Sequence, residues 1–320
     1  MPDHVSNHLA ARCYLGGFTD PDGWLMVRGR YGSNSRRARP KSVGFRNYFW
    51  GHDDLLRSTI EQRFGIAESN AAPALARIRQ VGLPPVGSPQ RGALVEFIAI
   101  HAVRTPAWRN LIFEVRDRLL REQGHDKPGF EHIADWVRSD DFWIAATARQ
   151  VPAIGTVLAS AYWDLVRFTS PWLLTCDQPL VQFPFLRANE RRLAVEARAT
   201  LLETLEFRFV VDPWHAIVIS WIDQVEELQP VNGNLRMAAD LNRSVGVRTD
   251  QEFFFLPGAD PPLAAPPWNA RDSVPLAGLI HEGYGTGEAT ESQRRHRAAG
   301  LLFESIDQDV TDQIRYVRLG

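Results

Sequence analysis

The chain has 320 residues, of which 44% are hydrophobic, and its formal net charge at pH 7 is -2. This length and hydrophobic share suit one large or two ordinary domains with a substantial core, and so small a charge excludes a global electrostatic attraction to nucleic acid or to anionic membranes. Its two cysteines, Cys13 and Cys176, cannot form a disulfide framework, which favours a cytoplasmic location.

No stretch of the chain has the pattern of a targeting or membrane segment. The amino terminus, MPDHVSNHLAARCYLGGF, contains an aspartate and two histidines and lacks the continuous apolar core of a signal peptide. The most apolar later stretch, residues 151–166, is interrupted by Pro152 and Gly155 and is shorter than the roughly 20 residues needed to span a bilayer. We therefore expect a soluble protein of the cytoplasm that has no membrane partner.

The first predicted elements lie between Leu25 and Trp50, where short strand-like runs flank a basic loop. The run DPDGW indicates a turn, and RGRYGSNSRRARPK, residues 28–41, combines arginine with glycine and serine. Two interpretations of this loop stay open. Its charges could simply be solvated, or it could bind nucleic acid through Arg36, Arg37 and Arg39.

A helical middle segment follows, over about residues 52–166. Its first part has apolar residues at steps of three and four, which predict an amphipathic helix or two with one buried stripe, formed by Ile60, Phe64, Ala67, Ala71, Leu75 and Ile78. The helical period continues beyond GLPPVGSP, and Pro106 predicts a kink or a break just after Arg104.

After Phe168 the pattern changes to strands. TLEFRFVV and HAIVISWI flank DPW, a hairpin signature with Asp212 and Pro213 at the turn, and the stretch NLRMAADLNRSVGVRT predicts a helix before the strand QEFFFLP. Strands do not alternate regularly with helices, so we predict an α+β fold, in which the helical middle packs against a small mixed or antiparallel sheet built from both ends. Residues 1–260 would form one domain, followed by a proline-rich arm and extension over 261–320.

Three groups of short motifs, in matching order and spacing over roughly residues 6–256, resemble the uncharacterised family catalogued as domain of unknown function 4238. They are HLAARCYLGGF; STIEQRFGIAESNAAPALARI with the later RTPAWR; and LLTCDQPLV with the later LNRSVGVRTDQEFFF. Two departures affect turns. Ala11 stands where the family usually has a proline, and only Pro213 remains of the usual Pro-Leu-Ser-Pro hairpin, which reads VVDP here.

The resemblance implies five site residues: His8, Glu68, Arg104, Asp177 and Asn242. Each also has a structural interpretation. His8 could be a core histidine bonded to backbone, Arg104 could form an ion pair with Asp177 or Glu68, and Asp177 could cap a turn. Asn242 lies in a helix pattern that disfavours asparagine, which indicates a hydrogen bond that retains it.

Two functions of different classes fit these residues. In the first, the protein is a metal-assisted hydrolase or nuclease, in which Glu68 and Asp177 bind a divalent metal, His8 joins them in catalysis, and Arg104 and Asn242 hold an anionic, nucleotide-like or other small-molecule substrate. In the second, the protein is a non-catalytic binding or sensor module, and the same residues form a structural polar network. Glu61, seven residues before Glu68, could share the first role but also fits a solvated helix edge paired with a neighbouring arginine.

Overall fold

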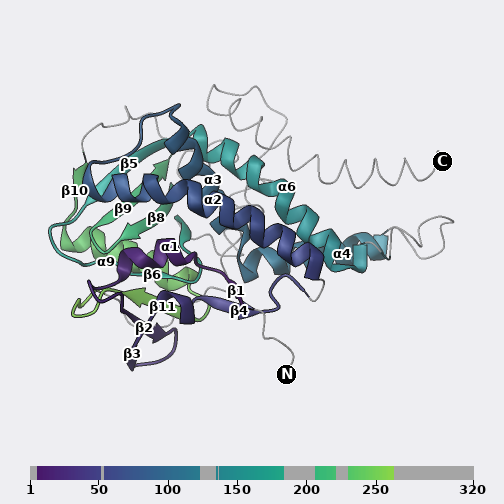
Figure 1. The fold of residues 1–320 in the computed structure, drawn as a ribbon, viewed down its shortest axis with the longest axis horizontal. Helices are drawn as coiled ribbons and strands as arrows, with labels where there is room; N and C mark the ends of the chain where they lie inside the picture. The colour runs from purple at the N-terminus through teal and green to yellow at the C-terminus, as the bar shows by residue number, and fades with distance from the viewer. Residues whose placement is uncertain are drawn as a thin grey trace.

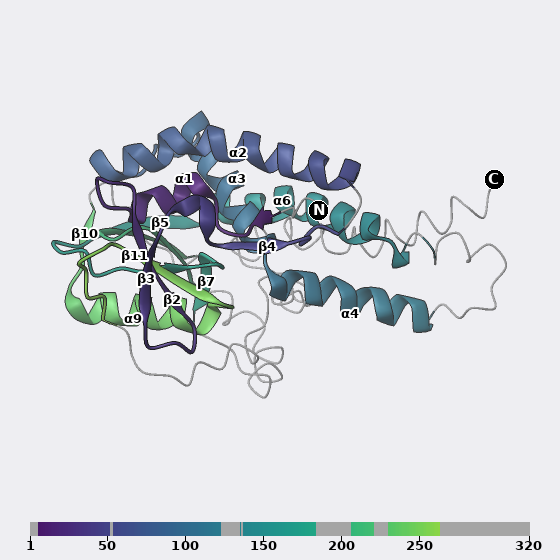
Figure 2. The same ribbon diagram turned by 60° about the horizontal axis from the view of Figure 1, so that its bottom comes forward.

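A computed structural model describes residues 6–51, 54–122, 135, 137–183, 206–220 and 230–262. The fold is α+β, as the sequence predicts. Figures 1 and 2 show most of the long helices gathered on one side of the molecule and the sheets on the other, with the last described helix packed against the sheets. The helices described are α1 (Arg12–Leu15), α2 (Asp54–Gln80), α3 (Pro89–Val103), α4 (Pro106–Glu122), α6 (Asp140–Ala159) and α9 (Leu235–Arg248), with short 3-10 turns η1 (Gly16–Phe18) and η2 (Pro40–Ser42).

The apolar stripe predicted for the helical segment is confirmed on α2. Each of its six residues is buried: Ile60, Phe64, Ala67, Ala71, Leu75 and Ile78. The break at Pro106 is confirmed as well, because α3 ends at Val103 and α4 begins at Pro106. At the start of α3 the Ser88 side chain accepts a hydrogen bond from the backbone N–H of Arg91, the usual way of satisfying a free helix N-terminus. Because α3 ends at Val103 and α4 begins at Pro106, Arg104 lies between two helices.

The described strands form three sheets. One is a pair of β1 (Ser6–His8) with β4 (Phe45–Asn47). The second has four strands in the order β3 (Ser35–Ala38), β2 (Leu25–Gly29), β11 (Glu252–Phe255) and β6 (Thr175–Cys176). The third has five, in the order β10 (Val231–Asn232), β5 (Tyr162–Arg167), β9 (His215–Ser220), β8 (Glu206–Asp212) and β7 (Leu180–Phe183).

The sequence predicts one sheet built from both ends of the chain, whereas in the structure these strands belong to separate sheets. The four-stranded sheet does join amino-terminal β2 and β3 to β6 and β11, whereas every strand of the five-stranded sheet comes after α6. The five-stranded sheet is mixed, because β10 pairs parallel to β5 and the other pairs are antiparallel. The predicted β8–β9 hairpin is confirmed: Asp212 is the last residue of β8, and Pro213 and Trp214 form the turn.

The five-stranded sheet has a helix on either side, since α2 and α3 contact β8 and β7 while α9 contacts β7 from below in the view of Figure 2. No helix within the described ranges is long and apolar enough to cross a membrane. The predicted arm and extension over 261–320 fall outside the described residues, apart from residues 261 and 262.

Candidate functional site

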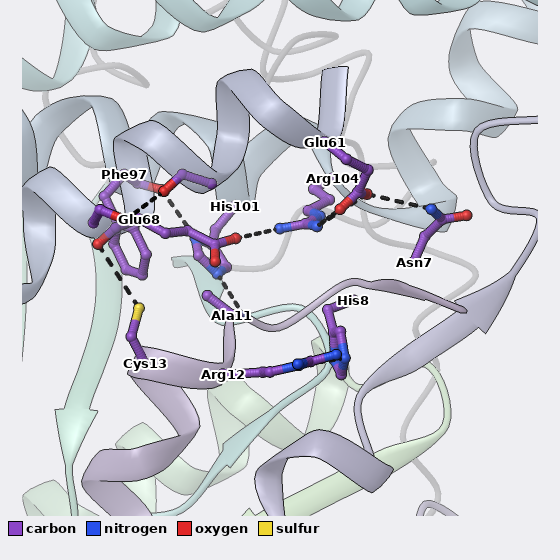
Figure 3. A network of polar contacts seen from close by, with 12 residues as sticks. Asn7, His8, Ala11, Arg12, Cys13, Glu61, Glu68, Phe97, His101 and Arg104 are labelled. Atoms are coloured by element: carbon purple, nitrogen blue, oxygen red, sulfur yellow. Dashed lines mark hydrogen bonds and ion pairs between the residues drawn. The ribbon is translucent and has the colours of Figure 1, made fainter. Parts of the chain in front are cut away.

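The centre of the candidate site is Arg104, the residue that caps the carboxyl end of α3. Its side chain is only 2% exposed, yet both terminal nitrogens have acidic partners. Nη1 donates to Glu68 Oε1 over 2.6 Å, and Nη2 donates to the two carboxylate oxygens of Glu61 over 3.1 and 3.0 Å. Figure 3 shows the three side chains in a row beneath α2. The ion pair with Glu68, one of two predicted for Arg104, is thus confirmed.

Helix geometry explains why one guanidinium reaches two carboxylates. Glu61 and Glu68 are seven residues apart, close to two full turns, so their side chains leave α2 on the same side. Phe64 lies between them, and its ring centroid is 5.4 Å from the Arg104 guanidinium carbon. The predicted pairing of Glu61 with a neighbouring arginine of its own helix is wrong, because its arginine partner, Arg104, comes from the end of a different helix.

Glu61 also connects this row to the amino-terminal strands. Its Oε1 accepts a hydrogen bond from Trp50 Nε1 over 2.5 Å and a long one from Asn7 Nδ2 over 3.4 Å. Asn7 is itself fixed, because its Oδ1 accepts the backbone N–H of Phe49 over 2.9 Å. The two carboxylates nevertheless keep contact with solvent, since the Glu61 and Glu68 side chains are 31% and 21% exposed.

His8 is the last residue of β1 and faces Arg104 from the opposite side in Figure 3. Its Nε2 accepts a hydrogen bond from Arg12 Nε over 2.9 Å, so the proton of the neutral ring is on Nδ1. That nitrogen is buried and has no hydrogen-bond partner among the described residues, although the nearby Val43 backbone acts to raise the pKa of the ring. Burial, helped by the charges of Arg12 and Arg104, lowers the pKa of His8 to about 4. His8 is therefore neutral at pH 7.

A second buried histidine, His101, lies one turn before Arg104, and the sequence did not single it out. Its Nδ1 donates to the Phe97 carbonyl over 2.9 Å, and its Nε2 accepts the Ala11 N–H over 3.4 Å. Burial lowers its pKa to about 4. Ala11 has φ -61°, a value that a proline could also adopt, but its N–H, which donates to His101, is a group that a proline would lack.

Asp177 follows β6 and has a different set of partners. Its Oδ1 accepts the backbone N–H of Asp250 over 2.9 Å, and its Oδ2 accepts that of Gln251 over 2.7 Å. The carboxylate thus holds the loop between α9 and β11. Asp177 therefore neither caps a turn made by the residues that follow it nor contacts His8 or Arg104 directly. Burial raises the pKa of Asp177 to about 7.

Asn242 is a fully buried residue of α9 that makes three hydrogen bonds with backbone. Its Oδ1 accepts the Leu174 N–H over 3.1 Å, and its Nδ2 donates to the carbonyls of Trp172 and Pro262 over 2.7 and 3.0 Å. The hydrogen bonds predicted to retain an asparagine in this helix are therefore present. Both Asp177 and Asn242 fasten α9 and its following loop to the segment around β6.

The turn of the β8–β9 hairpin holds a further polar group that the sequence did not mark as a site. The Asp212 carboxylate accepts the Trp214 N–H over 2.7 Å and lies 2.9 and 3.0 Å from His215 Nδ1. Aspartate stands here where the family usually has serine, and both side chains can accept a backbone N–H two residues later. The altered hairpin motif therefore still forms a closed turn.

The predicted site residues thus fall into two groups. His8, Glu68 and Arg104 lie together with Glu61, whereas Asp177 and Asn242 hold backbone on the other side of β6. Among the described residues there is no cluster of three or more histidine, cysteine or acidic side chains placed to hold a metal ion.

Comparison with known proteins places the chain in a family. No curated protein and no solved structure matches it. A family model does match, over residues 6–228, a range that includes β1, the helical segment and the β8–β9 hairpin. The resemblance expected from the short motifs is thereby confirmed up to residue 228, while the motif with Asn242 lies beyond the matched range. The chain belongs to the family described as "Protein of unknown function (DUF4238)".

Proposed function

We propose that this protein is a non-catalytic binding or sensor module in which the Arg104 network, made up of Asn7, Glu61, Glu68 and Arg104, joins the amino-terminal strands to the helical layer. The observation that supports this most is the state of Arg104. Its side chain is 2% exposed, both terminal nitrogens already donate to carboxylates, and its Nε–H, which has no partner among the described residues, is buried. An arginine that binds a substrate anion needs donors free to reach it.

The partners of Asp177 support the same proposal. Each oxygen accepts a backbone N–H, and recruiting this carboxylate to a metal would release the two donors of the α9–β11 loop. An unpaired buried N–H costs about 1–3 kcal/mol. The residues implied by the family resemblance therefore act, in this proposal, as the internal frame of the module.

A metal-assisted hydrolase or nuclease is the second candidate, and a specific observation favours it. The carboxylates of Glu61 and Glu68 are partly exposed, and Glu68 uses only Oε1 for Arg104. In this alternative the partly exposed Glu61 and Glu68 would bind a divalent cation, neutral His8 would accept a proton, and Arg104 would hold an anionic substrate. Asp177 and Asn242, which hold backbone on the other side of β6, would take no direct part.

Thermal unfolding with divalent metals separates the two candidates. The chelator-treated wild type, Glu68→Gln and the exposed control Glu114→Gln are heated with and without magnesium, manganese or zinc. A metal bound only to the native state adds about 2.7 kcal/mol at a hundred times its Kd. The binding module predicts that Glu68→Gln lowers the melting temperature equally with and without metal, and that no metal stabilises the wild type.

The hydrolase predicts the reverse pattern. A metal would stabilise the wild type and Glu114→Gln but not Glu68→Gln. The same preparations would then release p-nitrophenolate from bis-(p-nitrophenyl) phosphate, and Glu68→Gln would abolish the release. That combination of results would overturn the binding-module proposal.

A further inference from the structure

The β2–β3 hairpin with its flanks, residues 24–41, forms a basic surface, which we call the arginine hairpin. It contains no acidic residue and six basic ones: Arg28, Arg30, Arg36, Arg37, Arg39 and Lys41. The whole chain has a net charge of -2, so this is a local concentration of positive charge. Figure 1 shows the hairpin at the periphery of the fold, away from the long helices.

The hairpin presents three of these side chains, Arg36, Arg37 and Lys41, to solvent, whereas Arg28 and Arg39 are half-buried and Arg30 is buried. Strand β3 is the outer strand of the four-stranded sheet, so one of its edges has no partner strand among the described residues. The Arg36 and Arg37 side chains are 57% and 53% exposed, and Tyr31, in the loop between the strands, is 82% exposed. Exposed tyrosine at a basic loop is a feature that apolar packing does not explain.

Aromatic rings are interleaved with the arginines. The guanidinium carbons of Arg37 and Arg39 lie 5.5 and 4.2 Å from the centroid of the Trp24 ring, and that of Arg30 lies 5.3 Å from the Tyr31 ring. Arg28 lies over Phe253, at 5.6 Å. A guanidinium stacked on a ring is held in place. Arg39 also donates to the Asp22 carbonyl and buried Arg30 to the Thr249 carbonyl, so among the arginines on the Trp24 and Tyr31 rings it is Arg37 and the remaining N–H groups of Arg39 that can reach an anion.

The acidic residues near the hairpin balance only part of its charge. Arg36 pairs with Glu252 and Arg37 with Asp20, both as exposed ion pairs. Such pairs contribute about 0–1 kcal/mol, so a phosphate can replace them at little cost. Within the described ranges Arg28 and Lys41 pair with no carboxylate.

We propose that the arginine hairpin binds single-stranded nucleic acid. Its arginines would contact successive phosphates, and the exposed Tyr31 ring would stack on an unpaired base, which is the combination that single-strand-binding surfaces use. An acidic peptide would satisfy the charges and could pair with the free edge of β3, but it would leave the Tyr31 ring without a planar partner. The observation that favours nucleic acid is therefore the position of Tyr31 among the arginines.

Fluorescence anisotropy of a labelled single-stranded oligothymidylate, titrated with the full chain at several salt concentrations, tests this proposal. The variant Arg36→Gln/Arg37→Gln/Arg39→Gln should bind more weakly and show a salt slope reduced by about 2, because each phosphate contact on a single strand contributes about 0.7. Tyr31→Ala should weaken binding by about fivefold or more, since one stacked base is lost, whereas Tyr31→Phe should bind like the wild type.

The matched control removes the same number of charges from other exposed positions, in Arg63→Gln/Arg236→Gln/Arg243→Gln. It should bind like the wild type, and circular dichroism should show that both triple variants fold. Three results would overturn the proposal: no binding at low salt, an equal loss in the control, or binding unaffected by Tyr31→Ala. Equal displacement by polyglutamate and by unlabelled oligothymidylate would also overturn it and would assign the surface to acidic peptides.

Discussion

Arg104 and Glu68 are 36 residues apart in the chain, and their side chains meet at 2.6 Å. Arg104 caps the carboxyl end of α3 and Glu68 lies in the middle of α2, so this ion pair joins the two helices. Because Glu61 and Asn7 extend the contact to β1, the amino-terminal strands are tied to the helical layer by polar groups.

Replacing Arg104 by methionine should lower the free energy of unfolding by about 3 kcal/mol, because two carboxylates lose their cationic partner while the arginine stem is replaced by a similar volume. Urea denaturation of the full chain measures the change. Arg63→Met, at an exposed position of α2, should change stability by less than about 0.5 kcal/mol. Equal effects in the two variants would show that the Arg104 network does not stabilise the fold.

Asp177→Asn should destabilise the protein by about 1–3 kcal/mol, because asparagine has one oxygen where the structure requires two acceptors. Its amide nitrogen would face the N–H of Asp250 or of Gln251. Hydrogen exchange should accelerate at those two amides before the rest of the chain. Unchanged exchange and stability would mean that an asparagine can hold this loop as well as an aspartate.

The same variant should change the pH dependence of stability. Burial raises the pKa of Asp177 from 3.8 to about 7. At a pH between these two values the folded state therefore keeps the carboxyl proton, whereas the unfolded state has released it. The stabilisation from this proton is complete below about pH 4 and is lost as the pH rises through about 7. The stability difference between wild type and Asp177→Asn should therefore shrink from pH 4 to pH 8. A constant difference would contradict the raised pKa.

His101 should contribute in the opposite direction. Burial lowers its pKa from 6.5 to about 4, so the unfolded state binds a proton more readily and stability falls as the pH drops through this range. Between pH 7 and pH 5 the loss due to this residue is about 2 kcal/mol. His101→Phe should lose about that much less stability on acidification than the wild type, as measured by urea denaturation at each pH. Parallel curves for the two proteins would contradict the prediction.

Asn242→Ala should lower the free energy of unfolding by roughly 2–4 kcal/mol, because one buried acceptor and two buried donors disappear and their backbone partners stay unpaired. Asn242→Asp should be at least as damaging, since a carboxylate cannot donate to the Trp172 and Pro262 carbonyls. The exposed neighbour Arg243→Ala is the control and should change stability by less than about 0.5 kcal/mol. A silent Asn242→Ala would show that water satisfies these groups instead.

Local features were predictable from the sequence. The stripe on α2, the break at Pro106 and the turn at Asp212 and Pro213 each depend on residues within a few positions of one another. Side-chain periodicity and the missing N–H of proline decide such features whatever the rest of the chain does. The α+β class followed from the order of these elements.

The partners of the polar residues were not predictable in the same way. The sequence suggested a neighbouring arginine as the partner of Glu61, and the structure supplies Arg104, which is 43 residues away. Asp177 takes its two N–H donors from residues 73 and 74 positions later.

The sequence by itself therefore determined the helices, the hairpin and the family, whereas only the tertiary structure decided which charges meet. A helix pattern states which face a side chain leaves, but its partner depends on how two helices cross and how a distant loop packs. Those arrangements depend on how the whole core packs. Leaving a buried charge or N–H group unpaired costs free energy, so the fold favours the arrangement in which these groups find partners.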